Sequence, residues 1–194
     1  DAFAGLATGF GQSDDEYTGI GNLRLGSTYV DWAHRTRERG DDSTADSLFS
    51  LAVAPLETTR DSFEWIWDGN GGYHAWWGLG QVYASRGSIA VAASDFAAAE
   101  IHLADAVTVQ TEIIDAYEGV VWDDAIGEAY YQRADARVEL GLIATDPTVA
   151  DTYFDDAIAD FIVARDSYGH TNGGAMAGDA QNRIDEAETY RDNN

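Results

Sequence analysis

The stretch YHAWWGLGQVYASRGSIAVAASDFAAAEIHLADA, residues 73–106, decides the fold. Apolar residues recur in it at intervals of three and four, which is the periodicity of an amphipathic helix. Arg86-Gly87-Ser88 interrupts this pattern, because glycine favours a helix C-terminus and serine favours the N-cap of a following helix. The stretch therefore predicts two helices, at 73–86 and 89–116, joined by a turn at Gly87.

Two spaced patterns within this stretch indicate how the helices would pack. The first is W-x2-L-G-x2-Y, formed by Trp76, Leu79, Gly80 and Tyr83, and the second is A-x3-F-x2-A, formed by Ala92, Phe96 and Ala99. The small residues Gly80 and Ala92 would let two helices of a hairpin approach closely. Tyr83 and Phe96 would fill the space beside that contact, and Ala99 would let the next hairpin dock.

Weaker copies of both patterns lie on either side of this stretch. The first copy consists of Leu25, Gly26 and Tyr29, followed by Ala45, Phe49 and Ala52. The third copy has Ala134 as the small residue and Gly141 in the expected turn, followed by Ala157, Phe161 and Ala164; Arg133 and Arg137 replace its Leu and Tyr. A single hairpin cannot bury its apolar face alone, so the three copies are expected to stack.

The combined pattern resembles the tetratricopeptide (TPR) repeat family. This resemblance implies an all-α fold in which stacked antiparallel hairpins form a right-handed superhelix of about three repeats with a C-terminal cap helix. Residues 1–194 would then form a single domain. Its expected parts are an irregular N-terminal arm at 1–16, repeats at 17–60, 73–122 and 123–169, an aromatic and glycine-rich connector at 61–72, and a cap helix at 175–191.

Helix boundaries outside the central stretch follow from capping residues. Asp41-Asp42-Ser43-Thr44 after Gly40 indicates a helix stop followed by an N-cap, and Thr145-Asp146-Pro147 offers an N-cap with proline at the first helical position. Gly119, Gly141 and Gly169 are further expected breaks. The remaining predicted helices are 19–38, 42–58, 123–142, 148–168 and 175–191.

In the TPR family, the first helix of each hairpin lines a concave groove that holds a partner segment. The resemblance places the groove residues of the middle repeat at His74, Trp77, Gln81 and Ser85, those of the third at Glu128, Tyr131, Asp135 and Glu139, and those of the first at Leu23, Ser27 and Asp31. The implied groove is acidic, with aromatic patches at Trp77 and Tyr131. Such a surface would suit a basic or amide-rich segment.

The charge balance points to a salt-rich environment. Asp and Glu total 35 against 11 basic residues, a formal net charge of −24, and every basic residue is Arg. Mutual repulsion of these charges opposes compaction, but at about 1 M salt the Debye length falls to about 3 Å and most of the repulsion is screened. The composition resembles that of halophilic proteins, in particular haloarchaeal ones, and predicts that stability requires high salt. An acidic protein of ordinary environments with a cationic partner is the alternative.

Several function classes are disfavoured. The negative charge opposes nucleic-acid binding, and the chain has no run of about 20 apolar residues that could span a membrane. Cysteine is absent, the four His residues form no metal-binding pair, and Asp68-x-Asn70 begins like an EF-hand loop but has Leu79 at the twelfth position. Carboxylate pairs such as Asp123/Asp124 and Asp155/Asp156 are expected in so acidic a chain. We therefore expect no catalytic residue, metal or cofactor.

The segment 61–77 is the densest aromatic region. It contains Phe63, Trp65, Trp67, Tyr73, Trp76 and Trp77, which form either a core plug between the first two repeats or a ligand-binding edge, and the first interpretation is favoured. Trp76 occupies a packing position, whereas Trp77 falls on the other face and is the better surface candidate.

These observations favour a non-enzymatic scaffold that binds a protein segment in its groove. One alternative is a self-assembling subunit of an extracellular filament, surface layer or complex; a second is a small ligand-binding or carbohydrate-active helical protein that uses the 61–77 cluster. Numbering from Asp1 rather than Met suggests a processed or trimmed N-terminus. We expect an extracellular or cell-surface location over a cytoplasmic one.

Overall fold

The computed structural model describes residues 15–63, 70–119, 123–170 and 174–194. These residues form seven helices and no strand: α2 (Asp15–Arg37), α3 (Asp42–Phe63), α4 (Asn70–Ala92), α5 (Phe96–Tyr117), α6 (Asp123–Ile143), α7 (Pro147–His170) and α8 (Gly174–Asp192). The all-α class predicted from the sequence is thus confirmed for this part of the chain. Most of the expected N-terminal arm, together with Trp65, Trp67 and Asp68 of the connector, lies outside the described residues.

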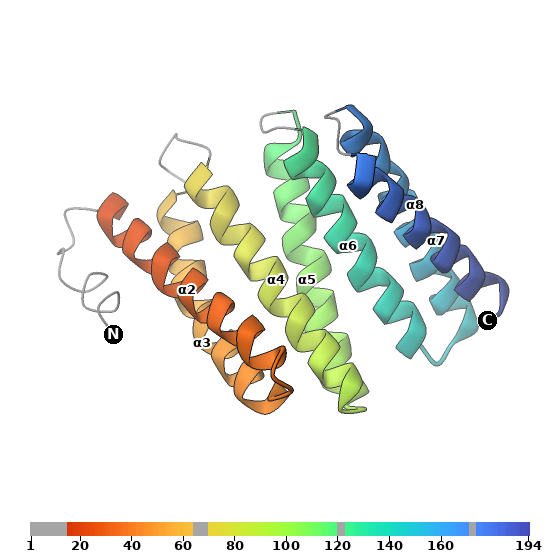
Figure 1. The fold of residues 1–194 in the computed structure, drawn as a ribbon, viewed down its shortest axis with the longest axis horizontal. Coiled ribbons are helices and arrows are strands. Elements are labelled where there is room, and N and C mark those ends of the chain that lie inside the picture. Colours follow the sequence, from red (N-terminus) through yellow and green to blue (C-terminus); the bar gives the residue numbers. More distant parts are fainter. Residues whose placement is uncertain (1–14, 64–69, 120–122, 171–173) are drawn as a thin grey trace.

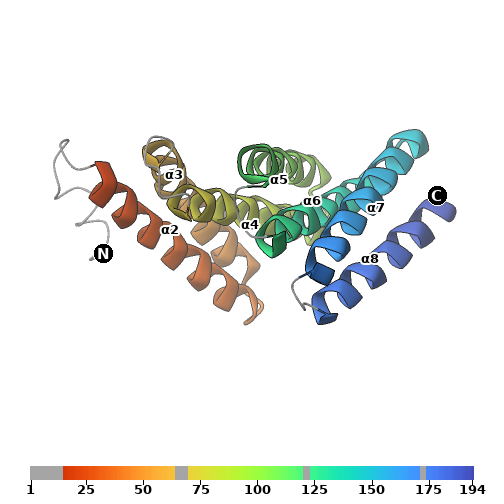
Figure 2. The same cartoon turned by 90° about the horizontal axis from the view of Figure 1, so that it is seen from above.

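The helices form a two-layered row of hairpins. Each helix packs against its neighbours in the chain, and in addition α2 contacts α4, α4 contacts α6, and α6 contacts α8. Figure 1 shows the row from α2 to α8 along the long axis of the molecule. In Figure 2, α2, α4, α6 and α8 lie on one side and α3, α5 and α7 on the other. None of the helices within the described ranges is long and apolar enough to cross a membrane.

A spacing of 54 residues relates the first helices of the hairpins. Small residues recur at Gly26, Gly80 and Ala134, and again at Ala33, Gly87 and Gly141. A Cβ atom on Gly80 would lie 2.0 Å from Gln110 Nε2, and one on Gly87 would lie 2.6 Å from Leu103 side-chain atoms. Glycine therefore sets the close approach of α4 to α5, and the equivalent Gly26 faces Leu56 in the same way, at 2.6 Å from Cγ.

The second helices repeat a matching set of buried residues. Alanine occupies the fourth and eleventh helical positions in α3, α5 and α7, and larger side chains occupy the eighth and fifteenth positions. All are buried: Ala45, Phe49, Ala52 and Leu56 in α3; Ala99, Leu103, Ala106 and Gln110 in α5; Ala150, Phe154, Ala157 and Phe161 in α7. The alternation of small and large residues lets each second helix pack between two first helices.

The predicted turn at Gly87 is wrong. Helix α4 continues through Gly87 to Ala92, and the chain reverses at residues 93–95, where Ser94 has a φ of 60° and the Asp95 side chain accepts a hydrogen bond from the backbone N–H of Ala98. The packing roles given to Ala92 and Phe96 are wrong as well. Ala92 is an exposed last residue of α4, and Phe96 is the first residue of α5 with 52% of its surface exposed.

Other boundaries follow local chemistry. Gly40 (φ 82°) and Gly119 (φ 77°) follow α2 and α5 as expected, and Asp41 caps α3 by accepting a hydrogen bond from the Thr44 N–H at 3.1 Å. Helix α7 begins at Pro147, as predicted. Gly141 and Gly169 do not break helices, because they lie within α6 and α7. Helix α2 begins at Asp15, before the expected position 19.

Candidate binding cavity

The predicted groove residues occupy one side of the first helices. The 54-residue spacing aligns Leu23 with Trp77 and Tyr131, Ser27 with Gln81 and Asp135, and Asp31 with Ser85 and Glu139. Within each helix these residues follow each other at intervals of four, so they lie one above another on a single face. The neighbouring side chains differ at each boundary between hairpins, and so does the space that remains.

An open cavity lies between α2 and α4. Its volume is about 430 Å³. The lining residues include six of the predicted groove positions, and the complete set is Leu23, Ser27, Val30, Asp31, His34, His74, Trp77, Gly78 and Gln81. Pockets of about 300–1,000 Å³ are typical of ligand sites. The structure thus brings the predicted residues of the first two hairpins together around one space.

The polar groups of this cavity are available for a ligand. Asp31 is exposed and forms no ion pair within the described part of the chain, and the Gln81 side chain makes no hydrogen bond to any described residue. Burial, followed by the charge of Arg37, lowers the pKa of His34. Its ring packs edge-on against Phe49, with 5.1 Å between centroids. Asp31 is the one carboxylate among the residues that line the cavity.

Helix α8 covers two of the predicted groove residues of the third hairpin, Tyr131 and Asp135. Asp135 accepts hydrogen bonds from Arg183, with Nη2 at 2.5 Å from Oδ1, and Tyr131 donates one to Asp179 at 2.5 Å. Burial raises the pKa of Asp135, and the charge of Arg183 opposes this shift. The groove therefore does not continue openly across three repeats, because the helix expected to cap the array covers Tyr131 and Asp135.

A smaller hollow of 270 Å³ remains at this boundary, beneath the start of α8. Glu128 and Tyr131 line it together with Tyr168, Ala175, Met176 and Asp179. Glu128 accepts hydrogen bonds from Tyr168 at 2.7 Å and from Gln132 at 2.9 Å. Most of the polar groups around this hollow are consequently paired with each other.

At the boundary between α4 and α6, Ser85 of α4 is buried and Glu139 of α6 is half-buried. Arg37 of α2 donates a hydrogen bond to Ser88 of α4 at 2.9 Å. Burial, followed by the charge of Asp135, raises the pKa of Glu139, which lies close to the Ser88 hydroxyl and to Arg37. The predicted sites Ser85 and Glu139 therefore belong to the contact between first helices and not to an open surface.

The described aromatic residues of the 61–77 segment separate onto two faces. Tyr73 and Trp76 pack edge-on against Tyr117 of α5, with centroid distances of 5.8 and 5.4 Å, and Trp76 Nε1 donates to Glu112 at 3.2 Å. Trp77 instead lines the α2–α4 cavity. The arrangement places Tyr73 and Trp76 in the packing between α4 and α5, and Trp77 at the candidate site.

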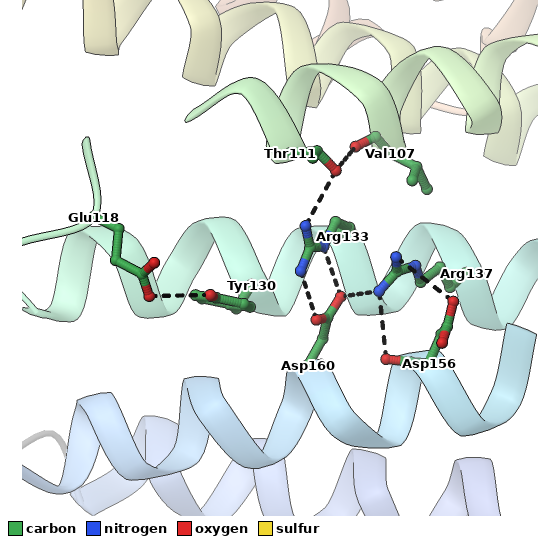
Figure 3. Close-up of polar contacts among 8 residues, drawn as sticks. All are labelled: Val107, Thr111, Glu118, Tyr130, Arg133, Arg137, Asp156 and Asp160. Carbon is green, nitrogen blue, oxygen red and sulfur yellow. Dashed lines mark hydrogen bonds and ion pairs between the residues drawn. The ribbon is translucent and has the colours of Figure 1, made fainter. Parts of the chain in front are cut away.

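The sequence interpretation missed a buried ionic cluster between α6 and α7. Arg133 binds Asp160 through two hydrogen bonds, Nε to Oδ2 at 2.8 Å and Nη2 to Oδ1 at 2.7 Å, and Arg137 Nη1 lies 2.5 Å from Asp160 Oδ2 (Figure 3). Arg133 also donates to Thr111 of α5 at 3.1 Å. The sequence does indicate this cluster, because Arg133 and Arg137 replace the Leu and Tyr of the other copies. Two buried arginines require an acidic partner on the facing helix.

A second hollow, of 360 Å³, lies where α5 begins beside the α6–α7 turn. Exposed Phe96 and Val149 line it, together with Leu140, Ile143 and Tyr153. Its position explains why Phe96 could not serve the core role predicted for it, since the helix start carries this ring to the end of the hairpin.

Comparison of the chain with protein-family models, with curated proteins and with solved structures finds no match.

Proposed function

We propose that this protein is a non-enzymatic helical scaffold that binds a segment of a partner protein in the cavity between α2 and α4. The observation that carries the proposal is the cavity itself, which is 430 Å³ in volume and receives lining residues from two separate hairpins. Both walls belong to helices that already pack against each other, so a bound segment need not order the protein first.

The composition of the wall favours a peptide side chain over a small metabolite. Trp77 offers a broad aromatic surface, and Trp is among the residues that contribute most to binding energy in protein interfaces. The other lining side chains are one carboxylate, one amide, two imidazoles, one hydroxyl and the two apolar side chains of Leu23 and Val30. No group of three or more His, Cys, Asp or Glu residues in the described ranges could hold a metal ion. These features support recognition through aromatic and hydrogen-bond contacts.

The test is selection of displayed random peptides on the immobilised protein in 2 M NaCl, followed by affinity measurements on variants. We expect the selected peptides to lose about tenfold or more of their affinity on Trp77→Ala, because truncation of an interface Trp costs more than about 1.4 kcal/mol. Trp32→Ala is the matched control, since Trp32 lies on α2, is 55% exposed and does not line the cavity. Peptides that bind the Trp77→Ala variant as well as the wild type would contradict the proposal.

A further inference from the structure

The α6–α8 boundary shows how this fold fills the space between two first helices. The Arg183 guanidinium of α8 reaches Asp135 of α6 with both Nε, at 2.9 Å, and Nη2, at 2.5 Å, from Oδ1. The same guanidinium lies over the Phe161 ring, with 5.7 Å between Cζ and the ring centroid. One arginine therefore spans the gap by contacting a carboxylate and an aromatic face.

The α2–α4 cavity also has a carboxylate and an aromatic ring on its wall, although not at the equivalent positions. Ser27 and Leu56 stand where α6 and α7 have Asp135 and Phe161, and the carboxylate and the ring come instead from Asp31 of α2 and Trp77 of α4. No arginine is among the residues that line this cavity. Arg37 of α2, whose charge acts on His34, is directed to Ser88 of α4 and to Asp42, at 2.9 and 3.8 Å.

The charge and shape of the cavity favour a guanidinium over an ammonium group. Trp is the best aromatic partner for a cation, with a contribution of about 0.5–2 kcal/mol depending on desolvation. A guanidinium is planar and weakly hydrated, so it stacks on an indole and binds a carboxylate at the same time, which an ammonium group does less well.

We infer that the α2–α4 cavity binds an arginine side chain of the partner segment, with its guanidinium between the Trp77 ring and the Asp31 carboxylate. The inference rests on the proposed function and specifies the anchor residue of the partner. Stacking on Trp77 keeps part of this affinity in concentrated salt, because only the interaction between the exposed charges is screened there.

The experiment uses N-acetyl-arginine amide, N-acetyl-lysine amide and N-acetyl-citrulline amide as probes, titrated into the full chain in 2 M NaCl. Binding is followed by the NMR signal of the Trp77 indole N–H, which is assigned as the signal missing from Trp77→Phe. We expect the arginine probe to bind most tightly, the lysine probe several-fold more weakly and the uncharged citrulline probe at least tenfold more weakly. Asp31→Asn should weaken the arginine probe about tenfold, equivalent to about 1.4 kcal/mol.

Asp105→Asn is the matched control, because it removes the same charge from an exposed position on α5 outside the cavity. Equal binding of arginine and citrulline, or an equal loss from Asp31→Asn and Asp105→Asn, would overturn the arginine anchor. The peptide selection separates this failure from that of the proposed function. Selected peptides that depend on Trp77 but not on Asp31, and that lack a common arginine, would leave the groove proposal standing and remove the anchor.

Discussion

The middle and third hairpins solve the same packing problem with opposite chemistry. In the middle hairpin, buried Leu79 and Val109 belong to one apolar cluster, and partly buried Tyr83 packs against it. In the third hairpin, the equivalent positions hold Arg133, Asp160 and Arg137, a cluster whose Arg133 and Asp160 side chains are only 12% and 7% exposed.

This difference shows that the small residues and the residues beside them have separate roles in the packing. Gly80 and Ala134 set the distance between the helices and are small in both hairpins. The positions beside them accept either apolar side chains or a fully paired set of charges. A buried ion pair carries a desolvation cost that cancels much of its attraction, so the ionic version is not expected to be the more stable one.

The largest expected effect concerns the exposed carboxylates that surround both hairpins. We expect the chain to lose its helical structure on dialysis from 2 M NaCl into dilute buffer, because screening of the net charge of −24 weakens as the Debye length grows from about 3 Å at 1 M to about 30 Å at 0.01 M salt. Far-ultraviolet circular dichroism measures the change. A spectrum that is unchanged in dilute buffer would contradict the halophilic interpretation. The ionic cluster of the third hairpin is buried, so its own contribution should vary little over the same salt range.

The next effect tests whether that cluster depends on all of its members. Asp160→Ala leaves Arg133 and Arg137 buried without their main partner and should lower the free energy of unfolding by about 3–5 kcal/mol. Denaturation by urea in 2 M NaCl provides the measurement. Asp156→Ala is the control, because Asp156 also pairs with Arg137, at 3.7 Å, but its side chain is 53% exposed. That change should cost less than about 1 kcal/mol, and equal losses in the two variants would show that burial does not determine the effect.

The smallest effect is expected when the ionic cluster of the third hairpin is replaced by the apolar residues of the middle hairpin. The triple variant Arg133→Leu, Arg137→Tyr, Asp160→Val gives the third hairpin the residues of the middle one. We expect its free energy of unfolding to equal that of the wild type or to exceed it by up to about 4 kcal/mol, since apolar replacements of buried ion pairs are neutral or stabilising. Thr111 loses Arg133 but keeps its hydrogen bond to the Val107 carbonyl at 2.8 Å (Figure 3). A triple variant as unstable as Asp160→Ala would show that the two hairpins are not interchangeable.

Much of the fold follows from the sequence, although the alignment of the second helices does not. Helical periodicity and the caps at Asp41 and Pro147 locate most helices to within a few residues. The A-x3-F-x2-A pattern does not mark equivalent positions in the second helices. The buried equivalents of Ala45 are Ala99 in α5 and Ala150 in α7, whereas the pattern begins seven residues earlier in the first case, at Ala92, and seven later in the second, at Ala157. Seven residues make about two helical turns, so the shifted pattern lies on the same face and periodicity alone cannot distinguish the alternatives.

The candidate site was predictable in part, for a related reason. The resemblance to the TPR pattern implied that Trp77 and Asp31 line one groove, and both residues line the α2–α4 cavity. Whether a neighbouring helix covers that face depends on long-range packing. Arg183 of α8 binds Asp135, which lies 48 residues away in the sequence, and no local sequence pattern predicts that contact.

The 54-residue spacing also limits how the length of this chain can change. Ala134 and Ala150 of the third hairpin are 16 positions apart, whereas the equivalent pairs Gly26/Ala45 and Gly80/Ala99 are 19 positions apart. Helix α6 ends correspondingly early, at Ile143. A deletion of three residues removes nearly one full turn and returns the buried face to its partner, whereas a deletion of one or two rotates that face by about 100° or 200°. Insertions and deletions in the first helices should therefore be tolerated in steps of three or four residues, or as whole hairpins, and rejected otherwise.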